Sequence, residues 1–180
     1  MAFTKIVIHQ IILATGQLLS VLLSQEIKNK HLFASKLNIK KGRYWCILLS
    51  GLFNSSISSY ISNILPILVC SLFTDKQTDC QYIVMLISSQ IIAIFASISM
   101  FPENFIMCGN SIQSFCLIGY SLMYGNFPVL SFVFDELNEI ISRTDGKINI
   151  YMAKRNTSGR LTNHLSHILG LILGIVFGCL

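Results

Sequence analysis

Long uncharged apolar stretches alternate with two basic, polar segments along the chain. Four of the stretches are long enough to form helices across hydrocarbon roughly 30 Å thick. They cover residues 6–23, 46–73, 81–101 and 161–180. A fifth, residues 105–134, is interrupted by glycine, asparagine and proline, which disfavour one continuous helix. The pattern predicts an all-α integral membrane helical bundle, with four full transmembrane helices plus a membrane-embedded or amphipathic segment over 105–134.

The distribution of positive charge decides how residues 105–134 are placed. Six of the thirteen Lys and Arg residues lie in the loop 24–45, and five lie in the tract 135–160. Basic loops tend to remain on one side of a membrane. A single crossing by 105–134 would put the two clusters on opposite sides, whereas zero or two crossings would keep them together. We therefore expect both segments on the same membrane side.

Composition places the chain among integral membrane proteins, because 53% of its residues are hydrophobic and only 12% are charged. Soluble domains carry about 25% charged residues. A length of 180 residues predicts a single transmembrane helical domain over 1–180. The net charge of +5 is concentrated beside apolar spans, where topology and anionic headgroups account for it. We therefore expect no nucleic-acid partner.

The second apolar stretch contains an unusually polar segment, Ser50–Asn63, in which eight of fourteen residues are Ser or Asn. Such a density is unfavourable against lipid, so we expect a membrane helix whose polar face contacts protein, water or a site. At helical spacing the serines expected to pack are Ser55, Ser58, Ser59 and Ser62. In the last stretch, four-residue intervals predict a seam for close helix contact at Gly170, Gly174 and Gly178.

The six cysteines form no CxxC pair and mostly lie in apolar stretches. Buried free thiols are favoured over a disulfide or metal framework by this distribution. We expect no metal ion and no cofactor.

Two stretches carry a further signal, Ser50–Ser58 in the opening part of the second span and Leu161–Gly170 at the start of the last. With the first span and its basic loop, their order resembles the divergent branch of the phosphatidic acid phosphatase type 2 superfamily, small membrane proteins related to acid phosphatases and vanadium haloperoxidases. Ser50–Ser58 corresponds to the family's Ser-Gly-Gly-Met-Pro-Ser-Ser-His-Ser motif. Leu161–Gly170 corresponds to its Gly-His-Thr-Pro-x-Glu-Val-x-x-Gly stretch. The resemblance covers most of the chain outside residues 105–160.

In that superfamily a histidine nucleophile attacks a phosphate, supported by a second histidine with an acidic partner and by Arg or Lys. Here the motif's histidine corresponds to Ile57, and the closing histidine corresponds to Thr162. His164 takes the closing position only if the alignment slips by two residues. The family's Asp-x-x-Gly-Val-Arg element would fall near 100–105, where no Asp or Arg stands. The resemblance implies a pseudo-phosphatase with degenerate motifs, whose vestigial catalytic positions are Asn54, Ser55, Ser56, Ile57, Thr162 and Ser166.

We expect a non-catalytic accessory or structural subunit of a larger membrane complex, in an organelle inner membrane of mitochondrial or plastid type. Its partners would be membrane lipids and other membrane-protein subunits. One alternative is a lipid-phosphate phosphatase that uses His164 or His167 with cations of the loop 24–45. Another is a small channel or carrier lined by the Ser- and Asn-rich face. Lipid headgroups are expected to contact Lys36, Lys40, Lys41, Arg43, His164 and His167.

Overall fold

The computed structural model describes residues 2–54, 56–71, 77–101, 103, 105–142 and 164–180. Within these residues the protein is built from helices, which confirms the predicted all-α class, and one isolated β-bridge pairs Ala34 with Met107. The elements in chain order are α1 (Ala2–Leu22), α2 (Gln25–Ile27), η1 (Lys28–Leu32), α3 (Lys36–Lys40), α4 (Trp45–Leu49), α5 (Ile57–Ser71), α6 (Asp79–Met100), α7 (Ser111–Leu122), η2 (Phe127–Val129), α8 (Leu130–Ser142) and α9 (His164–Cys179).

Helix length bears on the predicted four spans. In the part of the chain that the structure describes, α6 is the one helix long and apolar enough to cross a membrane. Three further apolar helices are 10 to 17 residues long, namely Val7–Leu22, Ile57–Cys70 and His164–Cys179. A spanning helix needs about 17–25 residues. The four-span count therefore stays a prediction.

The second apolar stretch is not one continuous helix, which corrects the expectation for residues 46–73. Helix α4 ends at Leu49, turns follow, and α5 begins at Ile57. Gly51 explains the close packing of the break, because a Cβ there would lie 2.8 Å from side-chain atoms of both Gln113 and Gln90. The chain therefore leaves the helical path at residue 50 and packs against the buried side chains of Gln90 and Gln113.

The basic loop 24–45 folds into short helices packed near the C-terminal end of α6. Ser35 caps α3 by accepting from the amide of Asn38, and Lys36 Nζ donates to the carbonyl of Phe101 at 3.0 Å. The Ala34–Met107 bridge ties the same loop to the segment before α7. The basic side chains of the loop are therefore carried by a backbone that is bonded to the rest of the fold.

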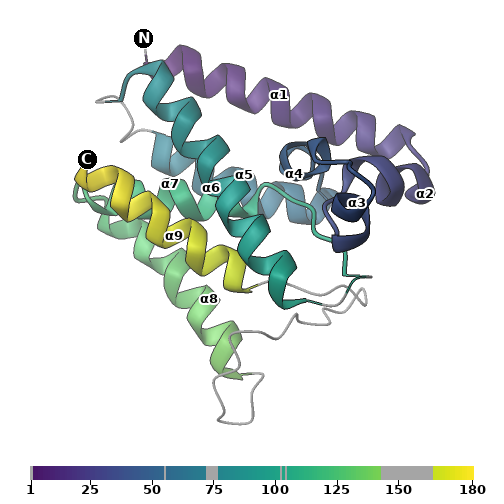
Figure 1. Ribbon diagram of the computed structural model, residues 1–180. Coiled ribbons are helices and arrows are strands. Elements are labelled where there is room, and N and C mark those ends of the chain that lie inside the picture. The colour runs from purple at the N-terminus through teal and green to yellow at the C-terminus, as the bar shows by residue number, and fades with distance from the viewer. Residues whose placement is uncertain (1, 55, 72–76, 102, 104, 143–163) are drawn as a thin grey trace.

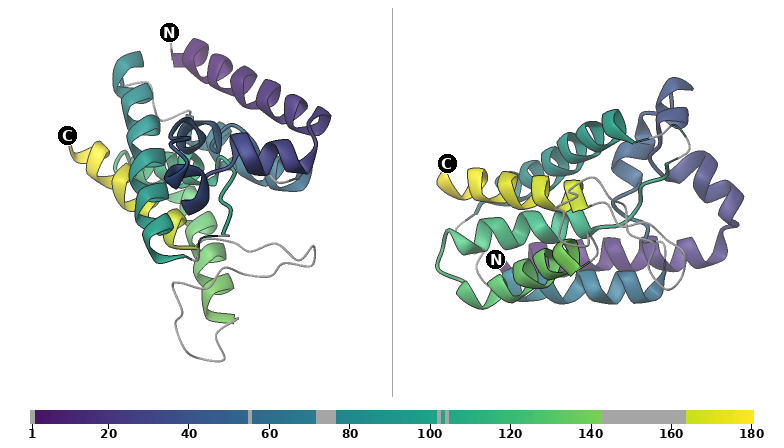
Figure 2. Two further views of the ribbon diagram at one scale, coloured as in Figure 1. Left: turned by 45° about the vertical axis from the view of Figure 1, so that its right-hand side comes forward. Right: turned by 90° about the horizontal axis from the view of Figure 1, so that it is seen from below.

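Helix α7 lies in the middle of the fold, and α9 runs alongside it in both views (Figures 1 and 2). Glycine makes this approach close. A Cβ on Gly174 would lie 1.9 Å from the Cys116 carbonyl oxygen, and one on Gly119 would lie 2.1 Å from that of Leu171. Real Cβ atoms do not come this near, so the helix backbones meet where side chains are absent.

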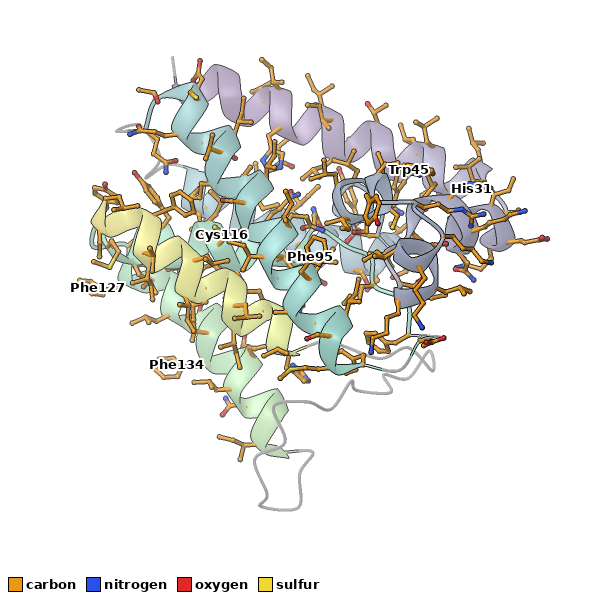
Figure 3. The ribbon with its side chains drawn as sticks, viewed as in Figure 1. His31, Trp45, Phe95, Cys116, Phe127 and Phe134 are labelled. Atoms are coloured by element: carbon orange, nitrogen blue, oxygen red, sulfur yellow. The ribbon has the colours of Figure 1, made fainter. Side chains whose placement is uncertain are left out.

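Large apolar side chains cover much of the outer surface, whereas many polar side chains lie inside. Figure 3 shows Phe127 and Phe134 projecting outward beside α8, and both are more than half exposed. Cys116 lies in the interior with no exposed surface. Buried polar side chains include Gln17, Ser50, Asn54, Gln90, Asn110, Gln113 and His164.

Candidate functional site

The polar stretch singled out in the sequence begins with a buried turn, residues 50–54. The amide of Asn54 donates to Gln17 Oε1 at 3.2 Å. Its side-chain oxygen accepts from the amide of Asn110 at 3.3 Å and from Asn63 Nδ2 at 3.1 Å. Asn54 thereby joins α1, α5 and the N-terminal end of α7. The turn acts as a hydrogen-bonded junction between three helices.

A second set of polar contacts continues from Ser50 toward α1. Gln90 Nε2 donates to Ser50 Oγ at 3.3 Å. Further along, His9 Nδ1 lies 2.8 Å from the Tyr82 hydroxyl, and His9 Nε2 lies 3.1 Å from Gln113 Oε1. The interior contacts of α1, α4, α6 and α7 are therefore partly polar.

Some polar atoms of this region have no hydrogen-bond partner among the described residues. They are Asn54 Nδ2, Gln90 Oε1 and both side-chain polar atoms of Asn110. An unpaired buried group costs about 1–3 kcal/mol. All of these groups are neutral amides, and residues 50–54 contain no ionisable side chain. The turn can position a polar group by hydrogen bonding. Its one hydroxyl, Ser50 Oγ, donates to the Ile47 carbonyl at 2.9 Å, and the turn supplies no ionisable side chain to act as a base.

Among the described residues, the positions implied by the phosphatase resemblance lie in different surroundings. Ile57 is 59% exposed on the outer surface of α5. Ser56 Oγ is hydrogen-bonded to Ser59 Oγ at 3.1 Å, whereas Ser166 is buried on α9. Ser55 and Thr162 lie outside the described residues.

The serine face of α5 lies mostly on the outside of the described chain. Ser58 and Ser62 are exposed, and Ser59 is partly buried. The buried side of the helix carries Ile67 and Cys70, which belong to the apolar core around α7. Apolar burial against that core sets the rotation of α5 and leaves the serines outside.

The glycines of the last helix, by contrast, all face α7 or the turn after it. Gly170 approaches the Ile112 carbonyl, Gly174 approaches the Cys116 carbonyl, and Gly178 approaches the Met123 side chain.

The basic side chains predicted to meet headgroups are held mainly by the protein. Lys36 donates to the carbonyls of Ser99 and Phe101, and Lys40 pairs with Glu103. Arg43 donates to the Lys30 carbonyl at 2.8 Å and to Asn38 Oδ1 at 3.2 Å. Lys41 is exposed. In the described part of the chain, the partners of Lys36, Lys40 and Arg43 do not include His164 or His167.

Those two histidines form the second polar centre, together with Glu136. Both lie on the first turn of α9, and Glu136 lies on α8. Glu136 Oε1 is 2.6 Å from His164 Nδ1 and 2.7 Å from His167 Nδ1. Residues three apart on a helix share a face, so both rings can reach one carboxylate. Three potential ligand atoms therefore converge between α8 and α9.

This Glu–His–His cluster (Glu136, His164 and His167) is shielded from solvent. Its side chains are 11%, 4% and 11% exposed in that order. The ring of Phe115 on α7 stacks on that of His167, with centroids 4.6 Å apart. Burial would raise the pKa of the Glu136 carboxyl, but the histidine charges and hydrogen bonds outweigh burial and lower that pKa to about 2. Glu136 is therefore held as a carboxylate.

The sequence prediction missed Glu136 and the pairing of the two histidines with it. The separation of 28 residues between Glu136 and His164 gives no local spacing that a motif could report. The glycine intervals in α9 could have indicated that its first turn, which carries both histidines, is held against a neighbouring helix. Chemically, the cluster offers imidazole nitrogens and a carboxylate, which can exchange a proton or bind a cation.

The cysteines offer no second centre of this kind. All six are free thiols; Cys46, Cys70 and Cys116 are buried, Cys108 is partly buried, and Cys80 and Cys179 are exposed. Among the described residues, the Glu–His–His cluster is the one group of at least three His, Cys, Asp or Glu side chains close enough to share a metal ion, and it contains no cysteine.

Comparison with known proteins does not assign the chain to a family. No protein-family model matches it, and no curated protein matches its sequence. The relationship to the phosphatidic acid phosphatases therefore stays a prediction.

Proposed function

We propose that the chain is a multi-pass integral membrane protein and a non-catalytic accessory or structural subunit of a larger membrane complex. The observation that carries the proposal is the placement of polar side chains inside and large apolar side chains outside. Gln17, Asn54 and Gln90 are almost fully buried, whereas Leu18 and Leu22 are 69% and 80% exposed. A soluble protein rarely exposes contiguous apolar surface on this scale.

The arrangement of the apolar helices supports the topology of the proposal. The N-terminal end of α1, the start of α6 and the C-terminal end of α9 lie toward one end of the molecule in Figure 1. The other ends of these three helices, the last of which is the start of α9, lie toward the basic loop 24–45 (Figure 1). Helices α1, α5, α6 and α9 would then cross in alternating directions, with the loop 24–45 and the start of α9 on one side (Figure 1). The positive-inside rule favours one side for the two basic segments.

The exposed serines of α5 support a protein partner. Ser58 and Ser62 stand on the outer surface beside the exposed Ile57 and Ile61. Small hydroxyl side chains favour close helix–helix contact in membranes. A second subunit packed on α5 would use these serines, whereas lipid would gain nothing from them.

The membrane part is tested by extracting membranes with alkaline carbonate, which removes peripheral proteins. The chain should remain in the pellet. Release into the supernatant would contradict membrane insertion.

The subunit part is tested by native electrophoresis after extraction in a mild detergent. The chain should migrate in a complex much heavier than its own 20.2 kDa. Ser58→Leu and Ser62→Leu should shift it toward the free chain. Leu18→Ser, on exposed α1, is the matched surface control and should leave the complex intact. Migration of the wild-type chain alone would contradict the proposal.

A lipid-phosphate phosphatase is the second candidate, favoured by the histidine pair with its acidic partner. Phosphate transfer also needs fixed cations for the phosphate oxygens. Lys36, Lys40 and Arg43 are engaged elsewhere, which ranks this candidate lower. Purified protein should release no phosphate from phosphatidic acid. Release that disappears in His164→Ala would establish the enzyme instead.

A further inference from the structure

We propose that Glu136, His164 and His167 form a binding site for one divalent transition-metal ion, with Zn²⁺ as the reference ion. The site lies where the first turn of α9 meets α8, and it involves neither the buried turn 50–54 nor the cysteines. It goes beyond the role of an accessory subunit and does not depend on it.

The donor set has the chemistry of a transition-metal site. Imidazole nitrogen and carboxylate oxygen are common ligands of zinc, and two histidines with one carboxylate also bind ferrous iron. Three protein ligands leave a coordination position for water or another ligand. The soft thiolate ligands that would select copper(I) are not part of the cluster.

The distances fit the binding of an ion after a small adjustment. The three ligand atoms all lie within 4.8 Å of one another. Zinc–ligand bonds of about 2.0–2.2 Å place tetrahedral ligands about 3.3–3.5 Å apart. The Glu136 oxygen, now 2.6 and 2.7 Å from the two nitrogens, needs to withdraw by less than about 1 Å. Rotation of a carboxylate provides a movement of that size without moving a helix.

Coordination also accounts for the use of the Nδ1 atom by both rings. Each Nδ1 now shares a hydrogen bond with Glu136 Oε1. On metal binding the proton of each ring resides on Nε2, and the Nδ1 lone pair faces the ion. One carboxylate oxygen can accept both of these hydrogen bonds, and the arrangement brings two nitrogens and one oxygen toward a common centre, as an ion requires.

The surroundings hold the ligands in place, which reduces the cost of ordering them. Phe115 stacks on the His167 ring at an interplanar angle of 9°. Gly170 lies one turn further along α9 and keeps that helix close to the backbone of α7 at Ile112. Ligands that are packed before the ion arrives bind it more tightly.

The test is a Co²⁺ titration of the full chain in detergent, with the exposed thiols alkylated, followed by Zn²⁺ competition. We expect one Co²⁺ per chain, a visible d–d absorption, no thiolate charge-transfer band, and displacement by Zn²⁺. Glu136→Gln keeps the shape and a hydrogen-bond acceptor but removes the charge. It should weaken binding more than about 100-fold, since loss of a mere outer-shell partner already costs 10–100-fold. His164→Asn and His167→Asn should do the same.

The controls use the two other histidines of the chain. His9 is partly buried and hydrogen-bonded to Tyr82, whereas His31 is exposed. His9→Asn and His31→Asn should keep full stoichiometry and affinity. The proposal is overturned if the wild-type chain binds neither ion, if Glu136→Gln binds as tightly as wild type, or if binding is lost in a control. Circular dichroism of each variant confirms its fold, and Glu136→Gln decides the outcome where the histidine variants do not fold.

Discussion

The molecule contains two buried polar regions that differ in kind. Around the turn 50–54 the polar groups are neutral: the Asn54 side-chain oxygen accepts from the Asn110 amide and from Asn63 Nδ2, and Gln90 Nε2 donates to Ser50 Oγ. Between α8 and α9, Glu136 meets two imidazole rings, all of them able to change charge. The first region joins helices that are distant in sequence. The second gathers ligand atoms at one point.

The groups that join the helices and the groups that can bind an ion therefore lie in different parts of the fold. The turn occupies the place where the phosphatase resemblance would put catalytic groups, yet it holds only amides and hydroxyls. The ionisable groups lie on α8 and at the start of α9 instead. Substitutions in the two regions should therefore have separable effects on stability and on metal binding.

The largest effect is expected from Glu136→Ala. It leaves two buried imidazoles without their shared partner, and breaking a buried ionic group costs about 3–5 kcal/mol. Thermal unfolding in detergent should show a correspondingly large fall in Tm. Glu136→Gln should cost clearly less, because its amide oxygen still accepts a hydrogen bond. Equal losses in the two variants would show that the charge, not the bonding, supports the fold.

Gly174→Ala tests whether α9 must lie close to α7 for the cluster to form. The new Cβ would lie 1.9 Å from the Cys116 carbonyl oxygen, so the helices must separate. We expect a loss near the upper end of the ~1–3 kcal/mol range for overpacking, and weaker Co²⁺ binding. Gly178→Ala is the comparison on the same face of α9, because its Cβ would first meet side-chain atoms of Met123, at 2.7 Å, and not a backbone carbonyl. Unchanged Co²⁺ affinity in Gly174→Ala would show that the cluster forms without this contact.

Asn54→Ala tests the turn alone. It removes the acceptor of Asn110 N and Asn63 Nδ2, but it also removes an unpaired Nδ2. We expect a net loss of about 1–2 kcal/mol in the free energy of unfolding, with no change in Co²⁺ affinity. Loss of metal binding in this variant would mean that the two regions are coupled.

Ile57→His restores the histidine of the resembled motif and should have the smallest effect. The position is 59% exposed on the outer surface of α5. Surface substitutions usually change stability by less than about 0.5 kcal/mol. No release of phosphate from phosphatidic acid is expected. Appearance of that activity would revive the phosphatase interpretation.

The sequence predicted the helical class and the ends of the third span well, because 81–101 is a continuous apolar run that nearly matches α6. It failed at residues 46–73, where Gly51 and Asn54 form interior contacts that hydropathy does not register. It predicted a packing face at the serines of α5 but not the surface that this face meets, since helical spacing gives a face but not its direction. The expected absence of a metal rested on cysteine spacing, whereas the Glu–His–His cluster joins residues through tertiary structure.

The most direct test of the division between the two regions is the shift in Tm that Zn²⁺ produces in two variants. A ligand that binds only the folded chain stabilises it by about 2.7 kcal/mol at 100 times its Kd. Asn54→Ala should start at a lower Tm and gain the same Zn²⁺ shift as the wild-type chain. Glu136→Gln should gain none. A shift that is lost in Asn54→Ala, or kept in Glu136→Gln, would contradict the placement of the site at Glu136, His164 and His167.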